Sequence, residues 1–355
     1  MKRQANFEVL RVVAMAMIVT LHFLQRGGIL LPLYEEINIV NTTGWLIKCF
    51  CIVAANCYVL IAGYFLVDAE WKCKKLLTLV SQIIFYSILI PVVCILLGIG
   101  NVRQWSIYEW ITAVLPLQMD HYWFATAYVL MFVLSPVLAA GVKQLSKKQL
   151  EWVIGILLVY FCVFKSLSPI LLATDRYGYD YPWFICLFLI AAYIRLYGNK
   201  ENGLQIGKVK LFTSAKASAG LYVVSALAIF AVSLVLGMIT ARIGKFDYYM
   251  NMVFSYNHIL TLLASLSFFY AFMYWEAKEN KVVRFVSKIA PYTFGVYLIH
   301  ENVAIRDLWT GWFLVEKVKD SLLFVPYMIL VIACLFVACM AIDYIRACIF
   351  KKVFK

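Results

Sequence analysis

The sequence predicts an all-α membrane protein, a bundle of about ten transmembrane helices. Of its 355 residues, 64% are hydrophobic and only 14% are charged, so a soluble fold would lack enough polar surface to cover itself. Apolar runs of roughly 20 residues recur along the chain, each bounded by charged or turn-forming residues. The longest polar stretch, near 199–217, is too short for a soluble domain. Residues 1–355 are therefore expected to form one transmembrane domain.

The apolar runs place the predicted spans in chain order. The first follows the basic start MKRQANF and lacks a small-residue cleavage site, so it is interpreted as an uncleaved span rather than a signal peptide. Lys165 and Pro169 interrupt the fifth, and residues 104–118 are expected to form an interfacial helix. The predicted spans are 7–25, 45–67, 76–99, 121–142, 151–172, 181–198, 218–241, 253–275, 289–308 and 321–345.

The positions of lysine and arginine orient these spans. With the N-terminus inside, most of the 32 basic residues fall on the inner side, and every even-numbered span ends at a basic cluster. We therefore expect a multi-pass protein of the plasma membrane with both termini in the cytoplasm. Topology accounts for most of the formal net charge of +13, so nucleic-acid binding is not needed to explain it.

The acidic residues show the opposite bias, and aromatic residues accompany them on the outer side, among them Tyr177, Tyr179 and Tyr181. Carboxylates beside aromatic faces suit carbohydrate hydroxyls and C–H groups. An interfacial aromatic belt with solvated loops explains the same pattern and is the favoured interpretation. The ten cysteines lie mostly in apolar runs without a CxxC pair, so they are interpreted as packing residues, and no metal site is predicted.

Arg11 and His22 lie inside the first predicted span, where ionisable groups are costly and usually mark a function. Eleven residues at about 100° each make roughly 1100°, or three turns plus about 20°, so both side chains share one helix face. They are about 16 Å apart along the axis, half the thickness of a bilayer core. Glu8, Met15 and Ile18 lie on the same stripe. A simple anchor helix does not need this pair, so we infer a functional site in which His22 accepts a proton.

The ninth predicted span contains His300, Glu301 and Asn302, three consecutive polar residues. Consecutive residues on a helix face different directions, so all three are not expected to point at one centre. We expect one to face a cavity and another to tie helices together. His300 and Glu301 are candidates to orient His22 or the molecule on which His22 acts.

Trp71, Lys72 and Lys75 follow the second predicted span in the segment GYFLVDAEWKCKKLL. Lys72 and Lys75 are three residues apart at the start of a helix, so they share a face and can hold phosphates. Trp71 can stack on a purine ring. Basic residues also anchor helices at the cytoplasmic face, and from this segment alone that interpretation is the stronger one.

Four segments together resemble the acyltransferase-3 family of integral membrane O-acyltransferases, which modify cell-surface polysaccharides and related carbohydrates. The most specific segment is Arg11 followed, after ten residues, by His22. The others are CYVLIAGYFLV at 57–67, HYWFATAYVLMFVLSPVL at 121–138 and TFGVYLIHEN at 293–302. They occur in the expected order and cover essentially the whole chain.

The resemblance implies an acetyl-CoA-dependent O-acyltransferase in which His22 is the catalytic residue, either as general base or as transient acyl carrier. It implies that Arg11, Lys72 and Lys75 hold the acyl-CoA donor, with Trp71 beside the purine. The family's basic pair is usually two arginines, whereas two lysines offer point charges without the bidentate fork. The acceptor is expected to be a carbohydrate hydroxyl, lipid-linked or polymeric, in a protein surrounded by membrane lipid. A homodimer is left open.

The alternative function is a carrier for a small polar molecule or an amino acid. In such a protein His22 would relay protons without transferring a group. The chain has no internal repeat of the kind that builds many transporters, and an arginine in the first span does not suit a free ion path. The sequence therefore favours the enzyme.

Overall fold

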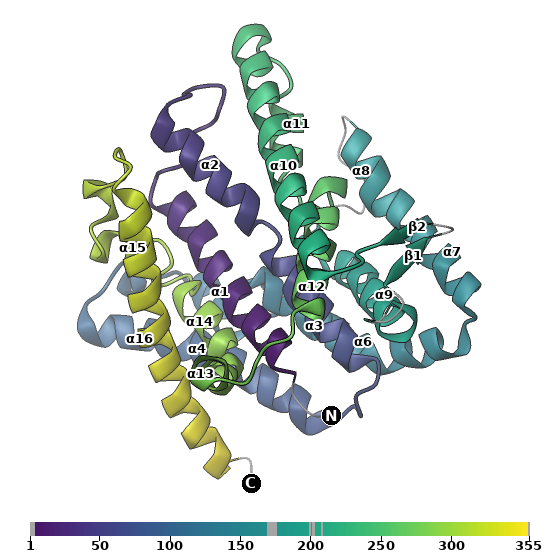
Figure 1. The fold of residues 1–355 in the computed structure, drawn as a ribbon. Helices are drawn as coiled ribbons and strands as arrows, with labels where there is room; N and C mark the ends of the chain where they lie inside the picture. Colours follow the sequence, from purple (N-terminus) through teal and green to yellow (C-terminus); the bar gives the residue numbers. More distant parts are fainter. Residues whose placement is uncertain (1–3, 169–175, 199, 201–202, 207–208, 354–355) are drawn as a thin grey trace.

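The structure is a computed structural model that describes residues 4–168, 176–198, 200, 203–206 and 209–353. Most of these residues are helical, and the strands among them form one short antiparallel hairpin, β1 (Leu204–Ile206) and β2 (Val209–Leu211). The predicted fold class, an all-α polytopic bundle, is confirmed (Figure 1).

The helices of the described chain vary from single turns to 30 residues in length. In chain order they are α1 (Ala5–Arg26), α2 (Ile39–Cys51), α3 (Ala54–Leu66), α4 (Cys73–Leu97), α5 (Ile107–Val114), α6 (Trp123–Gln144), α7 (Lys147–Leu158), α8 (Phe164–Leu167), α9 (Tyr181–Tyr197), α10 (Ala215–Ile243), α11 (Asp247–Met252), α12 (Ile259–Tyr274), α13 (Lys281–Ile289), α14 (Thr293–His300), α15 (Trp309–Trp312) and α16 (Phe324–Val353).

Each of the ten predicted spans corresponds to a helical stretch. Eight stretches of the described chain are long and apolar enough to cross a membrane. The shorter apolar helices α9 and α12 lie where the sixth and eighth spans are predicted. In the second span one turn at Ile52 and Val53 separates α2 from α3. Within the segment expected to be interfacial, α5 begins at a capping box formed by Ser106 and Glu109.

The fifth and ninth spans differ from their predictions. A π-helical turn at Val159–Val163 joins α7 to α8, and Lys165 lies inside α8 without interrupting it. Pro169 lies outside the described residues. The ninth span runs over α13 and α14 and ends at His300, so 289–308 is wrong at both ends. Its early end coincides with the contacts of Asn302, whose side chain accepts from the Ala304 N–H and donates to the Tyr86 carbonyl of α4.

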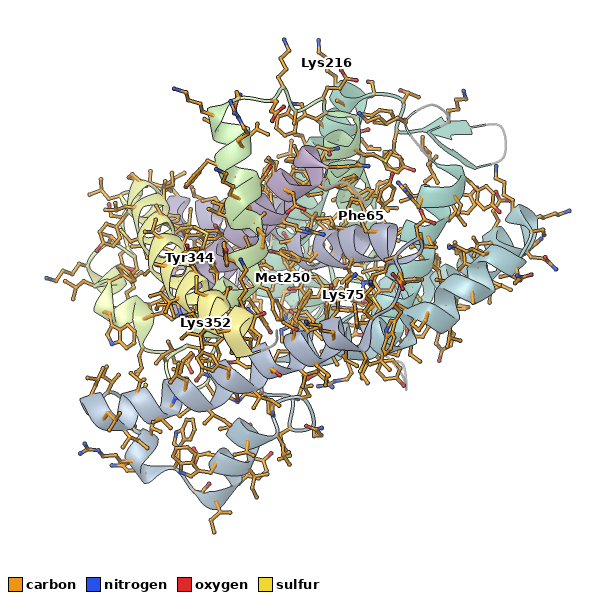
Figure 2. The ribbon with its side chains drawn as sticks, turned by 90° about the horizontal axis from the view of Figure 1, so that it is seen from below. Phe65, Lys75, Lys216, Met250, Tyr344 and Lys352 are labelled. Atoms are coloured by element: carbon orange, nitrogen blue, oxygen red, sulfur yellow. The ribbon has the colours of Figure 1, made fainter. Side chains whose placement is uncertain are left out.

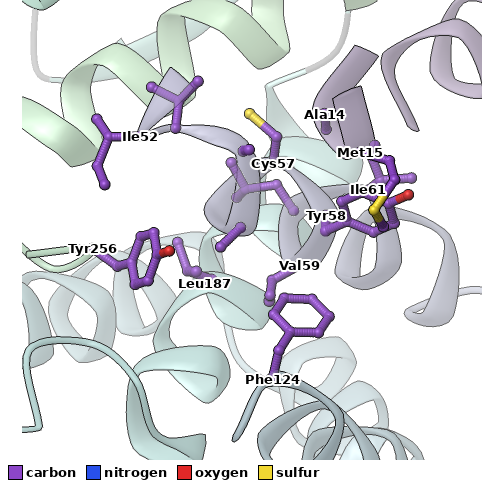
Figure 3. Close-up of a cluster of buried hydrophobic side chains, with 14 of the residues drawn as sticks. Ala14, Met15, Ile52, Cys57, Tyr58, Val59, Ile61, Phe124, Leu187 and Tyr256 are labelled. Carbon is purple, nitrogen blue, oxygen red and sulfur yellow. The ribbon is translucent and has the colours of Figure 1, made fainter. Parts of the chain in front are cut away.

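The centre of the bundle is α3, which packs between α1, α9 and α12. Its residues from Ala54 to Tyr64 are buried. Figure 3 shows how Cys57, Tyr58 and Val59 of this helix lie among side chains from α1, α6 and α9. Gly63 permits the close approach of α9, since a Cβ there would lie 2.9 Å from the Ala191 Cβ. The motif around Gly63 is thus explained by packing.

The bundle has two ends, which we name by helix α1. The inner end is where α1 begins at Ala5, and α16 also finishes there (Figure 1). The outer end is where α1 finishes at Arg26, near the start of α2. The described chain therefore starts and finishes on one side of the bundle. That this side is cytoplasmic is a prediction from the charge distribution.

Candidate functional site

A cavity of about 790 Å³ opens at the outer end of the bundle, and we call it the outer cavity. Its walls combine the last turns of α1, the end of α2 and the turns after α14. Aromatic residues from α6, α11 and the neighbouring loops complete them. The lining residues used below are His22, Arg26, Lys48, Trp123, Tyr179, Asp247, Tyr256, Glu301, Arg306 and Asp307.

His22 meets both of the other residues predicted to take part in catalysis. Its Nδ1 lies 2.9 Å from Nε2 of His300 and 3.1 Å from Oε1 of Glu301. Both neighbours reach one atom because α14 ends at His300 and the chain turns at Glu301. The expectation that consecutive residues diverge assumed a continuous helix. The residue that ties helices together is Asn302, whose amide also donates to the Tyr122 hydroxyl.

These contacts fix which nitrogen of His22 carries the proton. Nδ1 of His300 lies 2.6 Å from the Val296 carbonyl, and a carbonyl only accepts, so this nitrogen bears the hydrogen. Nε2 of a neutral His300 is then an acceptor for the N–H at Nδ1 of His22. Oε1 of Glu301 lies 3.1 Å from the same nitrogen, but its hydrogen-bonding capacity is unused among the described residues, so it is a neighbouring carboxylate oxygen rather than a second acceptor. Nε2 of His22 is therefore left with a free lone pair, and no described residue hydrogen-bonds to it.

Arg26 holds Glu301 in position from the opposite side. Its guanidinium lies 2.9 Å from Oε2 of Glu301 and 2.5 Å from Oδ1 of Asp307. Glu301 is nearly buried, so this pairing compensates a carboxylate that would otherwise be costly to desolvate. The pair of Glu301 and His22, with Arg26 on the far side of the carboxylate, resembles the acid–imidazole pair by which many enzymes orient a general base.

The ligand atoms of His22, His300 and Glu301 lie within 4.8 Å of one another, so these three residues are also the candidate metal ligands. Two imidazole nitrogens bound to one tetrahedral zinc ion are about 3.3 Å apart, given Zn–N bonds of about 2.05 Å. The observed 2.9 Å is a hydrogen-bond distance instead. The arrangement fits a proton relay better than a metal centre.

Arg11 lines a second, smaller cavity of about 220 Å³ at the inner half of the bundle, the inner cavity. Its guanidinium lies 2.8 Å from Glu8, one turn earlier on the same stripe. Leu79 and Gln82 of α4 form part of the opposite wall. Thus the stripe predicted on α1 connects two cavities, with Arg11 in one and His22 in the other.

The segment predicted to bind phosphate does not touch Arg11. Lys72 precedes α4 and pairs with Glu70 at 3.0 Å, with its side chain 55% exposed. Lys75 lies on the same α4 face as Leu79 and Gln82, one to two turns from the inner cavity. In the view onto the inner end, Lys75 appears near the middle of the face rather than at its rim (Figure 2).

Trp71 is partly exposed beside α6. With Lys75 and Pro136 it lines a recess of only about 10 Å³, which cannot enclose a purine ring. Any stacking at Trp71 therefore uses the exposed side of the indole. Of the four predicted donor-site residues, the structure places Arg11 in a cavity, Lys75 on the helix face leading to it, and Lys72 and Trp71 outside it.

Packed rings separate the two cavities, and we call Tyr58, Phe124 and Tyr297 the aromatic layer. The centroids of Tyr58 and Phe124 are 6.1 Å apart, and those of Phe124 and Tyr297 are 5.8 Å apart. The Tyr297 ring in turn lies 6.4 Å from His300. All three rings are buried. A continuous series of ring contacts thus leads from the inner cavity to the partner of His22.

Several polar residues of the membrane-spanning helices were not singled out from the sequence. Lys48 of α2 faces the outer cavity, with Nζ 4.1 Å from the Trp45 ring centroid. Asp343 and Arg346 of α16 form a buried ion pair that also binds Tyr86 of α4. The signal was available, because each of the three charges interrupts an apolar run.

Comparison with protein families gives one match. A family model described as an acyltransferase domain, that of the acyltransferase-3 family, matches residues 4–344. The match includes every residue that lines the outer and inner cavities, and also Trp71, Lys72 and Lys75. Searches of curated proteins and of solved structures returned no match.

Proposed function

The chain belongs to the acyltransferase-3 family and is a membrane acyltransferase, and we propose that it moves an acetyl group from acetyl-CoA to a carbohydrate hydroxyl. The donor enters from the cytoplasm, and the acceptor is a cell-surface or lipid-linked carbohydrate at the outer face of the plasma membrane. The relay at His22 is the observation that carries this proposal. It presents a basic ring nitrogen, held in one tautomer, at the wall of a cavity large enough for a sugar.

The transfer step follows from that nitrogen. Nε2 of His22 takes the proton of the acceptor hydroxyl while its oxygen attacks the thioester carbonyl. The C–S bond breaks, and the leaving CoA thiolate takes the proton from Nε2 of His22, which returns His22 to its neutral form. The N–H at Nδ1 of His22 keeps donating to Nε2 of His300, and the Glu301 carboxylate 3.1 Å away stabilises the imidazolium that forms. If Nε2 itself receives the acetyl group first, the same geometry serves, because the nucleophilic nitrogen is the same atom.

The donor path starts at the inner end. Phosphates meet Lys75, with Lys72 and Trp71 at the exposed rim, and the pantetheine arm passes Arg11 and the inner cavity. Helix geometry puts His22 about 16 Å beyond Arg11, a span that an extended pantetheine arm covers. The thioester then reaches His22 past the aromatic layer.

The alternative function, a carrier, requires a different relation between the outer and inner cavities. A carrier needs a passage through which the whole solute crosses between the two sides. Here the buried and contacting rings of the aromatic layer lie between the inner cavity and His300, and the first-span arginine is held by Glu8. The family match and this separation both favour group transfer over transport.

The test is thiol release from acetyl-CoA by purified protein, given a glycan fraction from cells that produce it. We expect release with wild-type protein and a loss of at least 100-fold in His22→Ala, since a positioned general base contributes about 10²–10⁴-fold. Mass spectrometry of the glycans identifies the acetylated hydroxyl. Absence of release with every glycan fraction, or full activity in His22→Ala, would contradict the proposal.

A further inference from the structure

Lys48 is an intramembrane cation that the acyl-transfer scheme leaves unused. It lies nine residues into α2, about 14 Å along the axis from the outer start of that helix. A charge at such depth is costly, and it normally lines a ligand path or finds a partner. Lys48 lines the outer cavity, as His22 does.

The surroundings of Lys48 contain rings but no acid. Its Nζ lies 4.1 Å from the centroid of Trp45 and 4.4 Å from that of Phe254. Among the described residues, no carboxylate oxygen lies within 4 Å of it. Lys48 is half-buried at the cavity wall, and the cation–π contacts, worth about 0.5–2 kcal/mol, are the interactions that the described residues give its charge. The cation is therefore only partly compensated.

The acids of the cavity are already committed or remote. Glu301 and Asp307 both pair with Arg26, and Asp307 also lies 3.6 Å from Arg306. Asp247 is exposed at the start of α11 and does not reach Lys48. Among the described cations that line the cavity, Arg26 and Arg306 are paired with carboxylates and Lys48 is not. An anion that enters the cavity can therefore bind Lys48 without displacing a carboxylate.

A platform of three rings completes the cavity. Trp123 lies 4.5 Å from Tyr179 and 5.5 Å from Tyr256 between centroids, and Tyr179 lies 4.8 Å from Tyr256. All three line the outer cavity. Aromatic faces of this kind pack against the apolar C–H face of a sugar ring, while its hydroxyls stay free for polar groups. Tyr179 was assigned to an interfacial belt from the sequence, whereas here it belongs to a cavity wall.

We propose that the acceptor is an anionic carbohydrate, and that Lys48 binds its carboxylate or phosphate while the ring platform holds the sugar. This inference rests on the proposed acyl transfer and specifies its substrate class. The oxyanion comes either from an acidic sugar or from the phosphate of a lipid-linked or phosphorylated one. Lys48 is then a specificity residue, and His22 acts on a hydroxyl of the same molecule.

The experiment measures binding without chemistry. Purified full-length protein in lipid nanodiscs is titrated calorimetrically with methyl β-glucuronide, glucose 1-phosphate and the neutral methyl β-glucoside. We expect at least one anionic probe to bind at least tenfold tighter than the neutral one, and the tighter of the two identifies the source of the oxyanion. In Lys48→Met this preference should fall below threefold, whereas Lys48→Arg should retain it. Lys245→Met, an exposed lysine outside the cavity, is the matched control.

A salt series on the wild type is independent of how any variant folds. Raising the NaCl concentration should lower the affinity for the anionic probe and leave that for the neutral probe unchanged, because salt screens the attraction between Lys48 and the oxyanion but not the packing of the sugar against the rings. Equal affinities for all probes in the wild type, or an undiminished preference in Lys48→Met, would overturn the proposal. Thiol release is followed in parallel. If thiol is released but anionic probes bind no tighter than the neutral one, only the proposed role of Lys48 is wrong. If anionic probes bind in a Lys48-dependent way but no thiol is released, the proposed acyl transfer itself is contradicted.

Discussion

Replacing the two side chains that face Nδ1 of His22, singly and together, tests the relay most directly. His300→Phe removes the ring nitrogen at 2.9 Å, and Glu301→Ala removes the carboxylate at 3.1 Å. Each single variant leaves the other group near the same N–H. In the double variant neither group is left, so nothing selects the tautomer with a free Nε2.

The expected magnitudes follow from this redundancy. Losing one of these interactions, worth about 1–1.5 kcal/mol, lowers kcat about tenfold. Losing both removes the orientation of the base and should approach the 10²–10⁴-fold effect of removing general-base catalysis. Two tenfold losses multiply to about 100-fold, so a loss well above 100-fold in the double variant is the signature of two groups sharing one task.

The assay is thiol release at saturating acetyl-CoA, with KM measured beside kcat. A positioning role lowers kcat and alters the pH profile, whereas a purely structural role lowers the yield of folded protein without changing either in the folded fraction. Asp307→Asn is the matched control, because it removes a carboxylate from Arg26 without touching His22. Full kcat in His300→Phe combined with Glu301→Ala would refute the relay.

Two further outcomes are expected. Lys75→Ala should raise the KM for acetyl-CoA about tenfold and Lys72→Ala by less than threefold, because Lys75 lies on the α4 face that leads to the inner cavity while Lys72 is exposed and paired with Glu70; equal effects on thiol-release kinetics would place the phosphates elsewhere. Gly295→Ala should destabilise the protein by about 1–3 kcal/mol, since its Cβ would overlap the buried carboxyl group of Asp343. An unchanged midpoint of thermal unfolding in detergent would show that α16 can shift without cost and would contradict this prediction.

The sequence predicts the helices well because a bilayer leaves little choice of structure to an apolar run of 20 residues. The shared face of Arg11 and His22 needs only the helical repeat, and the structure places both in cavities. The meeting of His300 and Glu301 at one atom was not predictable. It depends on where α14 ends, and that end coincides with contacts of Asn302 with residues more than 170 positions away.

The separation of the two cavities bears on how a donor and an acceptor on opposite sides of a membrane can react. A carrier has to pass its whole solute through the bundle, so its central barrier must open wide. An acyltransferase of the kind proposed passes only a slender thioester arm. Tyr58, Phe124 and Tyr297 close the bundle to a sugar, yet Phe124 and Tyr58 line the cavity where that arm would lie. In the proposed reaction the sugar would stay in the outer cavity and the nucleotide at the inner end, and only the acetyl group would reach Nε2 of His22.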